Sequence, residues 1–209
     1  IMKQMWTTGY GTLDGEHYQV DGAMCFPQPL QGTSLPGSKH NGIPMWVAGG
    51  GEKKTLRIAA EYADYTNFSG MPDDFSRKSE ILQRHCRDIG RDFEEIVRSA
   101  NFNVVIGRDA REVEARFDWI RAHYASAGLA EEAVEKIVRS FRGGPLVGTP
   151  EQVLETLTDM QARGLSYAIT YFVEAAYDTS GIELFEREVL PERVDHETHT
   201  SLWGLLSGR

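Results

Sequence analysis

The sequence predicts an α/β protein with a parallel sheet covered by helices. From residue 43 onward, short β-prone stretches alternate with segments whose apolar residues recur at helical spacing. Glycine, proline and acidic residues stand between these segments, where turns and helix ends need them. Strands that alternate with helices form right-handed βαβ units, and such units build a parallel sheet.

The first part of the chain is predicted to lie outside this alternation. Met2 and Met5 have the spacing of a helix that ends near Gly9, and Asp14-Gly15 is a strong hairpin signal ahead of a strand from residue 17. Residues 27–44 hold four prolines and three glycines and are predicted to form a loop. Because the chain begins within an amphipathic segment, we expect it to be part of something longer.

The alternation begins with 45–48, predicted as a short buried strand. Three glycines, Gly49–Gly51, lead from it into a helix with an apolar face from Leu56 to Ala63. Proline and acidic residues at helix starts predict the remaining helices, and runs of β-branched residues predict the remaining strands. They are strands at 65–68, 97–106 and 165–172, and helices at 72–90, 109–124, 134–141, 149–164 and 180–189.

Four core strands fit either a small open sheet or half of an eight-stranded barrel, which needs roughly 250 residues. The abrupt start of the chain favours the half-barrel. The alternating signals alone leave both architectures open.

Composition narrows the function classes. The chain has 209 residues, a net charge of −9 and 41% apolar residues, as expected of a soluble globular protein with a real core. The acidic balance argues against nucleic acid or an anionic membrane as partner. No run approaches the ~20 apolar residues of a membrane helix, and no signal peptide is visible. Cys25 and Cys86 lack metal-ligand spacing and are expected to be reduced. We therefore expect a cytoplasmic enzyme or binding protein without a metal.

The three glycines, Gly49–Gly51, call for a physical reason. They lie between a parallel strand and the next helix, at the sheet edge where α/β proteins bind ligands. Free N–H groups and the positive helix end would cradle a phosphate there. The alternative is steric: glycine permits a tight turn and close packing. Lys53 and Lys54 stand where the P-loop and the dinucleotide fingerprint need glycine, so both motifs are excluded.

Several stretches resemble one known family. PMWVAGGGEKKTLRIAAEYADYTNF (44–68) is similar to the fifth strand, phosphate-binding turn and fifth helix of the bacterial luciferase-like flavin and deazaflavin oxidoreductases. GEHYQV (15–20) resembles the insertion before that strand. Three later stretches resemble the last helix and eighth strand of the family's barrel and its closing helix: LVGTPEQVLETL, GLSYAITYF and FEREVLPE. The resemblance runs to about residue 193 and is greatest to the coenzyme F420-dependent branch.

The resemblance implies a (β/α)8 TIM barrel of which this chain supplies about strands five to eight. Residues 1–193 would form the C-terminal half-barrel, including an insertion hairpin at 9–43, and 194–209 a C-terminal tail. In the family, contacts to the cofactor ring come largely from strands one to four, so no catalytic residue is assigned here. We expect this truncated chain to be inactive without the N-terminal half-barrel. A homodimer is a further candidate partner, since dimers are frequent in the superfamily.

The resemblance also implies a cofactor site and an activity. Its phosphate-binding main chain corresponds to Ala48, Gly49, Gly50 and Gly51. The activity would be hydride transfer between coenzyme F420 and an organic small-molecule substrate. The alternatives are an FMN-dependent monooxygenase and a non-catalytic half-barrel that serves binding or assembly.

Other side chains are secondary candidates. The ends of two predicted strands offer residues for a substrate pocket, with core packing as the alternative: Asn67, Phe68, Tyr171 and Phe172. Lys53, Lys54 or Arg57 could reach an anionic cofactor tail. For Arg57 the alternative is an exposed ion pair with Glu61 at i, i+4.

Overall fold

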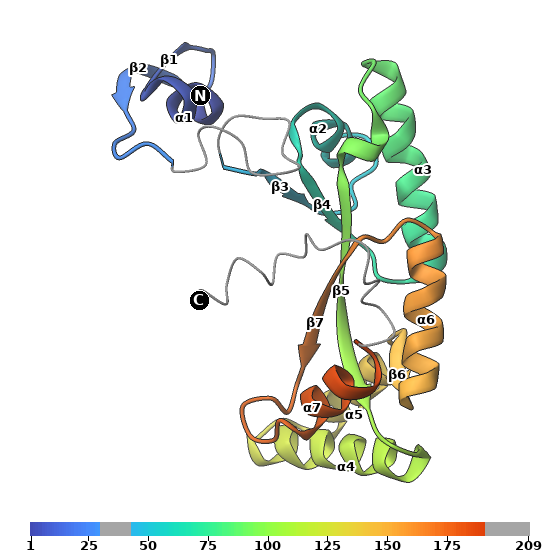
Figure 1. The fold of residues 1–209 in the computed structure, drawn as a ribbon. Helices are drawn as coiled ribbons and strands as arrows, with labels where there is room; N and C mark the ends of the chain where they lie inside the picture. Colours follow the sequence, from blue (N-terminus) through green and yellow to red (C-terminus); the bar gives the residue numbers. More distant parts are fainter. Residues whose placement is uncertain (30–42, 191–209) are drawn as a thin grey trace, which may run out of the picture. The chain divides into compact units, whose positions relative to one another are not determined.

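The computed structural model describes residues 1–29 and 43–190 (Figure 1). The chain divides into two compact units, one formed by residues 1–68 and 77–99 and the other by 69–76 and the chain from residue 100. Part of the predicted insertion (30–42) and the whole predicted tail (194–209) lie outside the described residues.

The first unit opens with a helix and a hairpin. Helix α1 (Met2–Thr8) ends at Gly9, whose φ of 82° is left-handed, as predicted for a glycine C-cap. Strands β1 (Tyr10–Asp14) and β2 (Gln19–Met24) pair antiparallel. Strand β2 begins two residues later than predicted. The reason is that the turn includes His17 and Tyr18 and is closed by the Gly15 N–H donating to the Tyr18 carbonyl at 3.0 Å.

The same unit holds the first β/α repeats. Strand β3 (Trp46–Ala48) leads to helix α2 (Thr55–Tyr62), and strand β4 (Tyr65–Phe68) pairs with β3 in parallel. Helix α3 (Pro72–Asp88) follows, and the short η1 (Phe93–Glu95) precedes strand β5 (Val97–Ile106). This unit contains α3 from Arg77 onward and β5 up to Ser99, and the rest of both elements belongs to the second unit. Residues with fully buried side chains hold this unit together: Leu56, Ala59, Ala60, Ala63, Leu82 and Cys86.

The prediction that residues 45–48 form a buried strand is wrong about burial. Trp46 is 43% exposed, and its ring stacks on Tyr65 with centroids 4.8 Å apart. Strand β3 is the first in the sheet order, and no described strand pairs with its outer edge. A strand at the edge of a sheet has a neighbouring strand on one side only. Its apolar sequence therefore does not imply that its side chains are fully buried.

The second unit contains the remaining helices and strands. Helices α4 (Ala110–Ser126) and α5 (Glu131–Arg142) are followed by β6 (Leu146–Gly148), α6 (Pro150–Ala162), β7 (Tyr167–Phe172) and α7 (Ser180–Glu188). Its core contains the apolar faces predicted for two helices, joined by one residue of β5 and one from the turn after β7: Val105, Val113, Phe117, Ile120, Val134, Val138, Phe141 and Val173.

The sheet has the strand order β3-β4-β5-β6, and β7 pairs with β5. The β3–β4 and β5–β6 pairings are both parallel, which confirms the predicted α/β class. Strand β6 was not predicted. It has only three residues between Gly144–Pro145 and the helix start at Thr149, too few for a periodic signal.

Helix starts show where side-chain signals are reliable. Asp109 caps α4 by accepting from the Glu112 N–H at 2.8 Å, and Thr149 with Gln152 forms a full capping box on α6. The last helix, α7, begins at Ser180 as predicted. Thr179 is the N-cap of α7. No helix in the described part of the chain combines the length and apolar character that a membrane crossing requires.

Candidate functional site

The glycine turn is anchored to the neighbouring strand. Ala48 lies opposite Asn67 in the β3–β4 pairing, and the Gly49 N–H donates to the Asn67 carbonyl at 2.7 Å. Gly49 has a φ of +113°, a conformation that L side chains rarely adopt. The chain therefore needs glycine at position 49 for the backbone alone.

The next two glycines leave backbone donors uncovered. The N–H groups of Gly50 and Gly51 donate to no residue in the described ranges. Helix α2 follows within four residues and has no side-chain cap, because its N-cap residue is Lys54. Unused donors beside a helix start form an arrangement that binds anions.

Packing also constrains these two positions. A Cβ on Gly51 would lie 2.7 Å from the Thr55 hydroxyl, and one on Gly50 would lie 3.3 Å from the Lys78 side chain. These distances support the steric explanation for the glycines, and the phosphate explanation stays a prediction. Both require that no side chain cover the turn.

A lysine from α3 reaches the turn. Lys78 Nζ donates to the Gly50 carbonyl at 2.5 Å and lies 3.1 Å from Glu52 Oε1, while Arg77 contacts the same carboxylate oxygen. The hydrogen bond from Arg77, and then that from Lys78, holds the pKa of Glu52 below its usual value. Two cations of α3 therefore lie next to the glycines, with Glu52 as their counter-ion.

The depressed pKa of Glu52 predicts a pH-dependent contribution to stability. Its ion pairs are present above the ordinary carboxyl pKa of 4.5 and are lost as the pH falls through the lower folded-state value. Glu52→Gln is expected to lower the melting temperature at pH 7 and to match the wild type at about pH 3. Differential scanning calorimetry at both pH values checks this.

The matched control is Glu80→Gln, an exposed glutamate of α3, the helix of Arg77 and Lys78, that has no ion pair with a described residue. It should leave the melting temperature unchanged at both pH values. An equal loss for Glu52→Gln at low and neutral pH would show that the carboxylate charge is not what stabilises the turn.

The structure brings some predicted site residues together and separates others. Ala48, the glycines and Asn67 form one cluster at the ends of β3 and β4, and Phe68 beside them is buried. Tyr171 and Phe172 belong to the second unit. Phe172 is buried against Phe185, and Tyr171 is 57% exposed. The pocket role of these four residues stays a prediction. Arg57 and Glu61 form the predicted i, i+4 pair at 3.2 Å.

No local pattern in the sequence predicts Lys78 or Arg77 as neighbours of the turn. Lys78 lies 28 residues beyond Gly50, on a helix that was predicted from its apolar face and its first-turn acids. A contact over that separation depends on how α3 packs, and one sequence carries no local signal for it.

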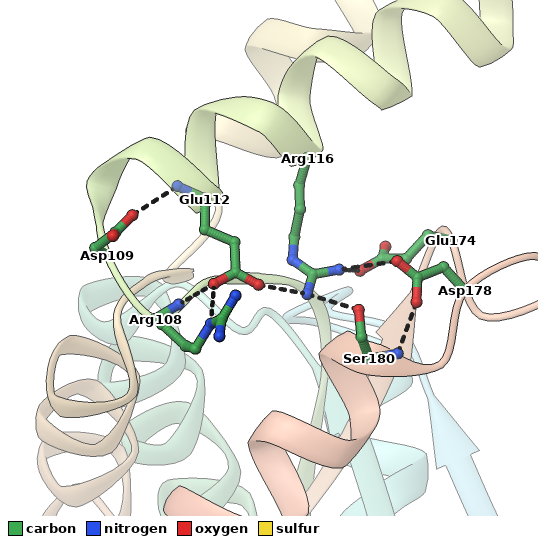
Figure 2. A network of polar contacts seen from close by, with 7 residues as sticks. All are labelled: Arg108, Asp109, Glu112, Arg116, Glu174, Asp178 and Ser180. Atoms are coloured by element: carbon green, nitrogen blue, oxygen red, sulfur yellow. Dashed lines mark hydrogen bonds and ion pairs between the residues drawn. The ribbon is translucent and has the colours of Figure 1, made fainter.

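The second unit contains a buried polar network (Figure 2). Arg116 of α4 donates to Glu174 at 3.0 Å and to the Ser180 hydroxyl at 3.1 Å, and its Nη2 lies 3.4 Å from Glu112. The side chain of Arg116 points from α4 towards the segment between β7 and α7 (Figure 2). Asp178, in that segment, accepts from the Ser180 N–H at 2.9 Å.

The two carboxylates at the edge of this network, Glu112 and Asp178, both have hydrogen-bond donors. The hydrogen bond from Arg108 holds the pKa of Glu112 below its usual value, and the Ser180 N–H does the same for the pKa of Asp178. At its centre one oxygen of Glu174 and the Arg116 Nε have no hydrogen-bond partner among the described residues. The network fixes the segment after β7.

Comparison with solved structures identifies the fold. The chain superposes on the coenzyme F420-dependent tetrahydromethanopterin reductase of Methanopyrus kandleri with a TM-score of 0.65 and 18% identity, over 91% of this chain and 60% of that one. A riboflavin lyase with modified FMN and riboflavin gives a TM-score of 0.61 and 16% identity, over 88% of this chain and 48% of that one. The fold is that of the luciferase-like TIM barrels.

Sequence comparison identifies the family. The model of the luciferase-like monooxygenases matches residues 1–167, and the chain belongs to that family. Pyrimidine monooxygenase RutA of Stutzerimonas stutzeri is 28% identical over 138 residues, which are 64% of this chain and 33% of that protein. The chain thus spans about a third of the length of this curated relative.

Proposed function

We propose that this chain is part of an oxidoreductase that transfers hydride between coenzyme F420 and a small organic substrate, and that the turn Ala48–Gly51 binds the cofactor phosphate. The observation that carries the proposal is the pair of uncovered N–H groups at Gly50 and Gly51, one short turn ahead of the uncapped start of α2. Backbone donors at a helix start favour a phosphate over neutral groups.

The residues of the turn fit such a group. An anion at the N–H groups would meet no side chain of the three glycines, and the ammonium of Lys78 lies beside the Gly50 carbonyl. The deazaflavin, when bound, supplies the hydride chemistry. The chain's own part is to hold the phosphate end and so to orient the ring, with Asn67 and Phe68 proposed at the adjoining strand end.

The domain organisation belongs to the same proposal. Residues 1–193 would be a C-terminal half-barrel with an insertion at 9–43, completed by an N-terminal half-barrel that supplies the ring contacts. The outer edge of β3, on which no described strand pairs, supports this, because a parallel sheet normally has both faces and edges covered. Tyr171 and Phe172 would lie at the end of the closing strand, and a homodimer would be a further level of assembly.

An FMN-dependent monooxygenase is the second candidate. The similarity to RutA and to the riboflavin lyase with modified FMN supports it. Both cofactors carry a phosphate, so the glycine turn serves either one. A non-catalytic half-barrel that keeps the turn for binding or assembly is the third candidate.

Parallel fluorescence titrations of coenzyme F420 and FMN test the proposal. Saturable quenching of the deazaflavin at concentrations where FMN shows none is the expected result. Tighter binding of FMN would support the monooxygenase. Binding of neither would contradict the cofactor role of the turn in this chain.

A further inference from the structure

A surface pocket lies next to the glycine turn, within the first unit. Its volume is about 530 Å³, and it is lined by Glu52 and Lys53, which follow the glycines, and by the last turns of α3. Ile81 is buried at the pocket, and Arg84 and Arg87 are exposed along it. The comparisons and the predicted phosphate turn assign no role to this pocket.

The pocket is positively charged in a chain whose net charge is −9. Lys53, Arg84 and Arg87 form no ion pair with any residue of the described ranges. Of the two acids in the lining, Glu52 is already paired with Arg77 and Lys78, which leaves Asp88. Three cations therefore face the pocket with one uncommitted carboxylate.

Cations near the C-terminal end of a helix also offset its dipole, which accounts for basic residues in the last turn of α3. That effect does not explain Lys53, which comes from the turn after β3 and faces the same pocket. Cations from two separate elements therefore line the same pocket. This arrangement is expected of a binding site and not of a helix end that is merely solvated.

The pocket and the glycine turn are within reach of one extended ligand. Lys78 contacts the Gly50 carbonyl, and His85 Nε2 lies 2.8 Å from the Glu52 carbonyl. These two residues of α3 are two turns apart, which is about 10 Å along a helix. The segment after the glycines therefore runs beside α3 from the turn to the pocket.

We propose that this pocket binds a carboxylate-bearing tail of the cofactor whose phosphate lies at the glycine turn. The inference rests on the proposed function. Coenzyme F420 carries carboxylates beyond its phosphate, whereas FMN ends at the phosphate, so the pocket distinguishes the two cofactors. The guanidinium groups of Arg84 and Arg87 match a carboxylate in shape and charge, and Lys53 supplies a third cation.

The test removes two charges without touching the turn. Arg84→Gln/Arg87→Gln is expected to weaken binding of coenzyme F420 about tenfold, the size expected when two exposed charge contacts are lost. Affinity for FMN should stay within about twofold. Lys136→Gln/Arg139→Gln, two exposed cations of α5, changes the net charge equally and should affect neither titration.

A second measurement separates failure of the pocket from failure of the turn. Amide NMR shifts are followed during titration with a glutamylglutamate dipeptide and, separately, with inorganic phosphate. The dipeptide should shift residues 84–88 in the wild type and not in the double variant, and phosphate should shift residues 49–52. Phosphate shifts at the turn without dipeptide shifts at the pocket would overturn the tail site and leave the phosphate turn standing.

The remaining outcomes are also decisive. Phosphate shifts at residues 84–88 in place of the turn would make the pocket a phosphate site and overturn the tail assignment. If the dipeptide binds while neither cofactor does, the proposed function is wrong, and the pocket is an anion site unconnected with a cofactor. Equal loss of affinity for both cofactors in the double variant would also refute a site for the tail.

Discussion

Arg116→Ala is expected to lower the free energy of unfolding by about 3–5 kcal/mol, since it strands a buried carboxylate. Arg116 is 8% exposed and Glu174 3%, and the two side chains are 3.0 Å apart. Water cannot replace the guanidinium without opening the segment after β7. Urea unfolding monitored by circular dichroism measures the loss.

Two further variants make the cause identifiable. Arg121→Ala removes an arginine of the same helix whose pair with Glu135 is half-buried and still reached by water, and it should cost no more than about 1 kcal/mol. Arg116→Met/Glu174→Leu removes both charges and should recover much of the loss. A loss below about 1 kcal/mol for Arg116→Ala would mean that water already reaches the pair.

Gly50→Val is expected to weaken cofactor binding at least about 100-fold, or about 2.7 kcal/mol. A branched side chain would cover the N–H groups that the phosphate needs, and its Cβ would lie 3.3 Å from Lys78. The deazaflavin titration measures the loss of affinity, and thermal unfolding shows whether the variant keeps its fold.

The control for this substitution is Gly143→Val. A Cβ at Gly143 meets its nearest atom at 3.5 Å, an ordinary contact, and the residue lies in the other unit. This variant should bind the cofactor as the wild type does. If Gly50→Val loses stability but keeps its affinity, the glycine serves packing against Lys78 and the phosphate site lies elsewhere.

Local signals predicted most of the elements because the determining groups are close in sequence. Asp109 with Glu112 and Thr149 with Pro150 mark their helices within one turn, and the structure has both caps. Strand β6 lacked such a signal because it is only three residues long. The exposure of Trp46 depends on the place of β3 in the sheet order, which the residues around it do not encode.

The glycine turn of the candidate site could be predicted from the sequence, but the cations of α3 beside it could not. Glycines at 49–51 indicate a turn open to a ligand, and the structure adds uncovered N–H groups at two of them. The cations come from positions whose distance in sequence hides their proximity, as with Lys78 at 28 residues from Gly50. The same holds for Arg116 and Glu174, which are 58 residues apart.

The turn is tied down on each side of its uncovered donors. Asn67 accepts from the N–H of Gly49, Lys78 donates to the carbonyl of Gly50, and the Leu56 N–H donates to the carbonyl of Gly51. Folding has therefore already paid the conformational entropy that three glycines would otherwise lose when they close on an anion. The turn is preorganised, so most of its attraction for the phosphate that we propose there would remain available as affinity.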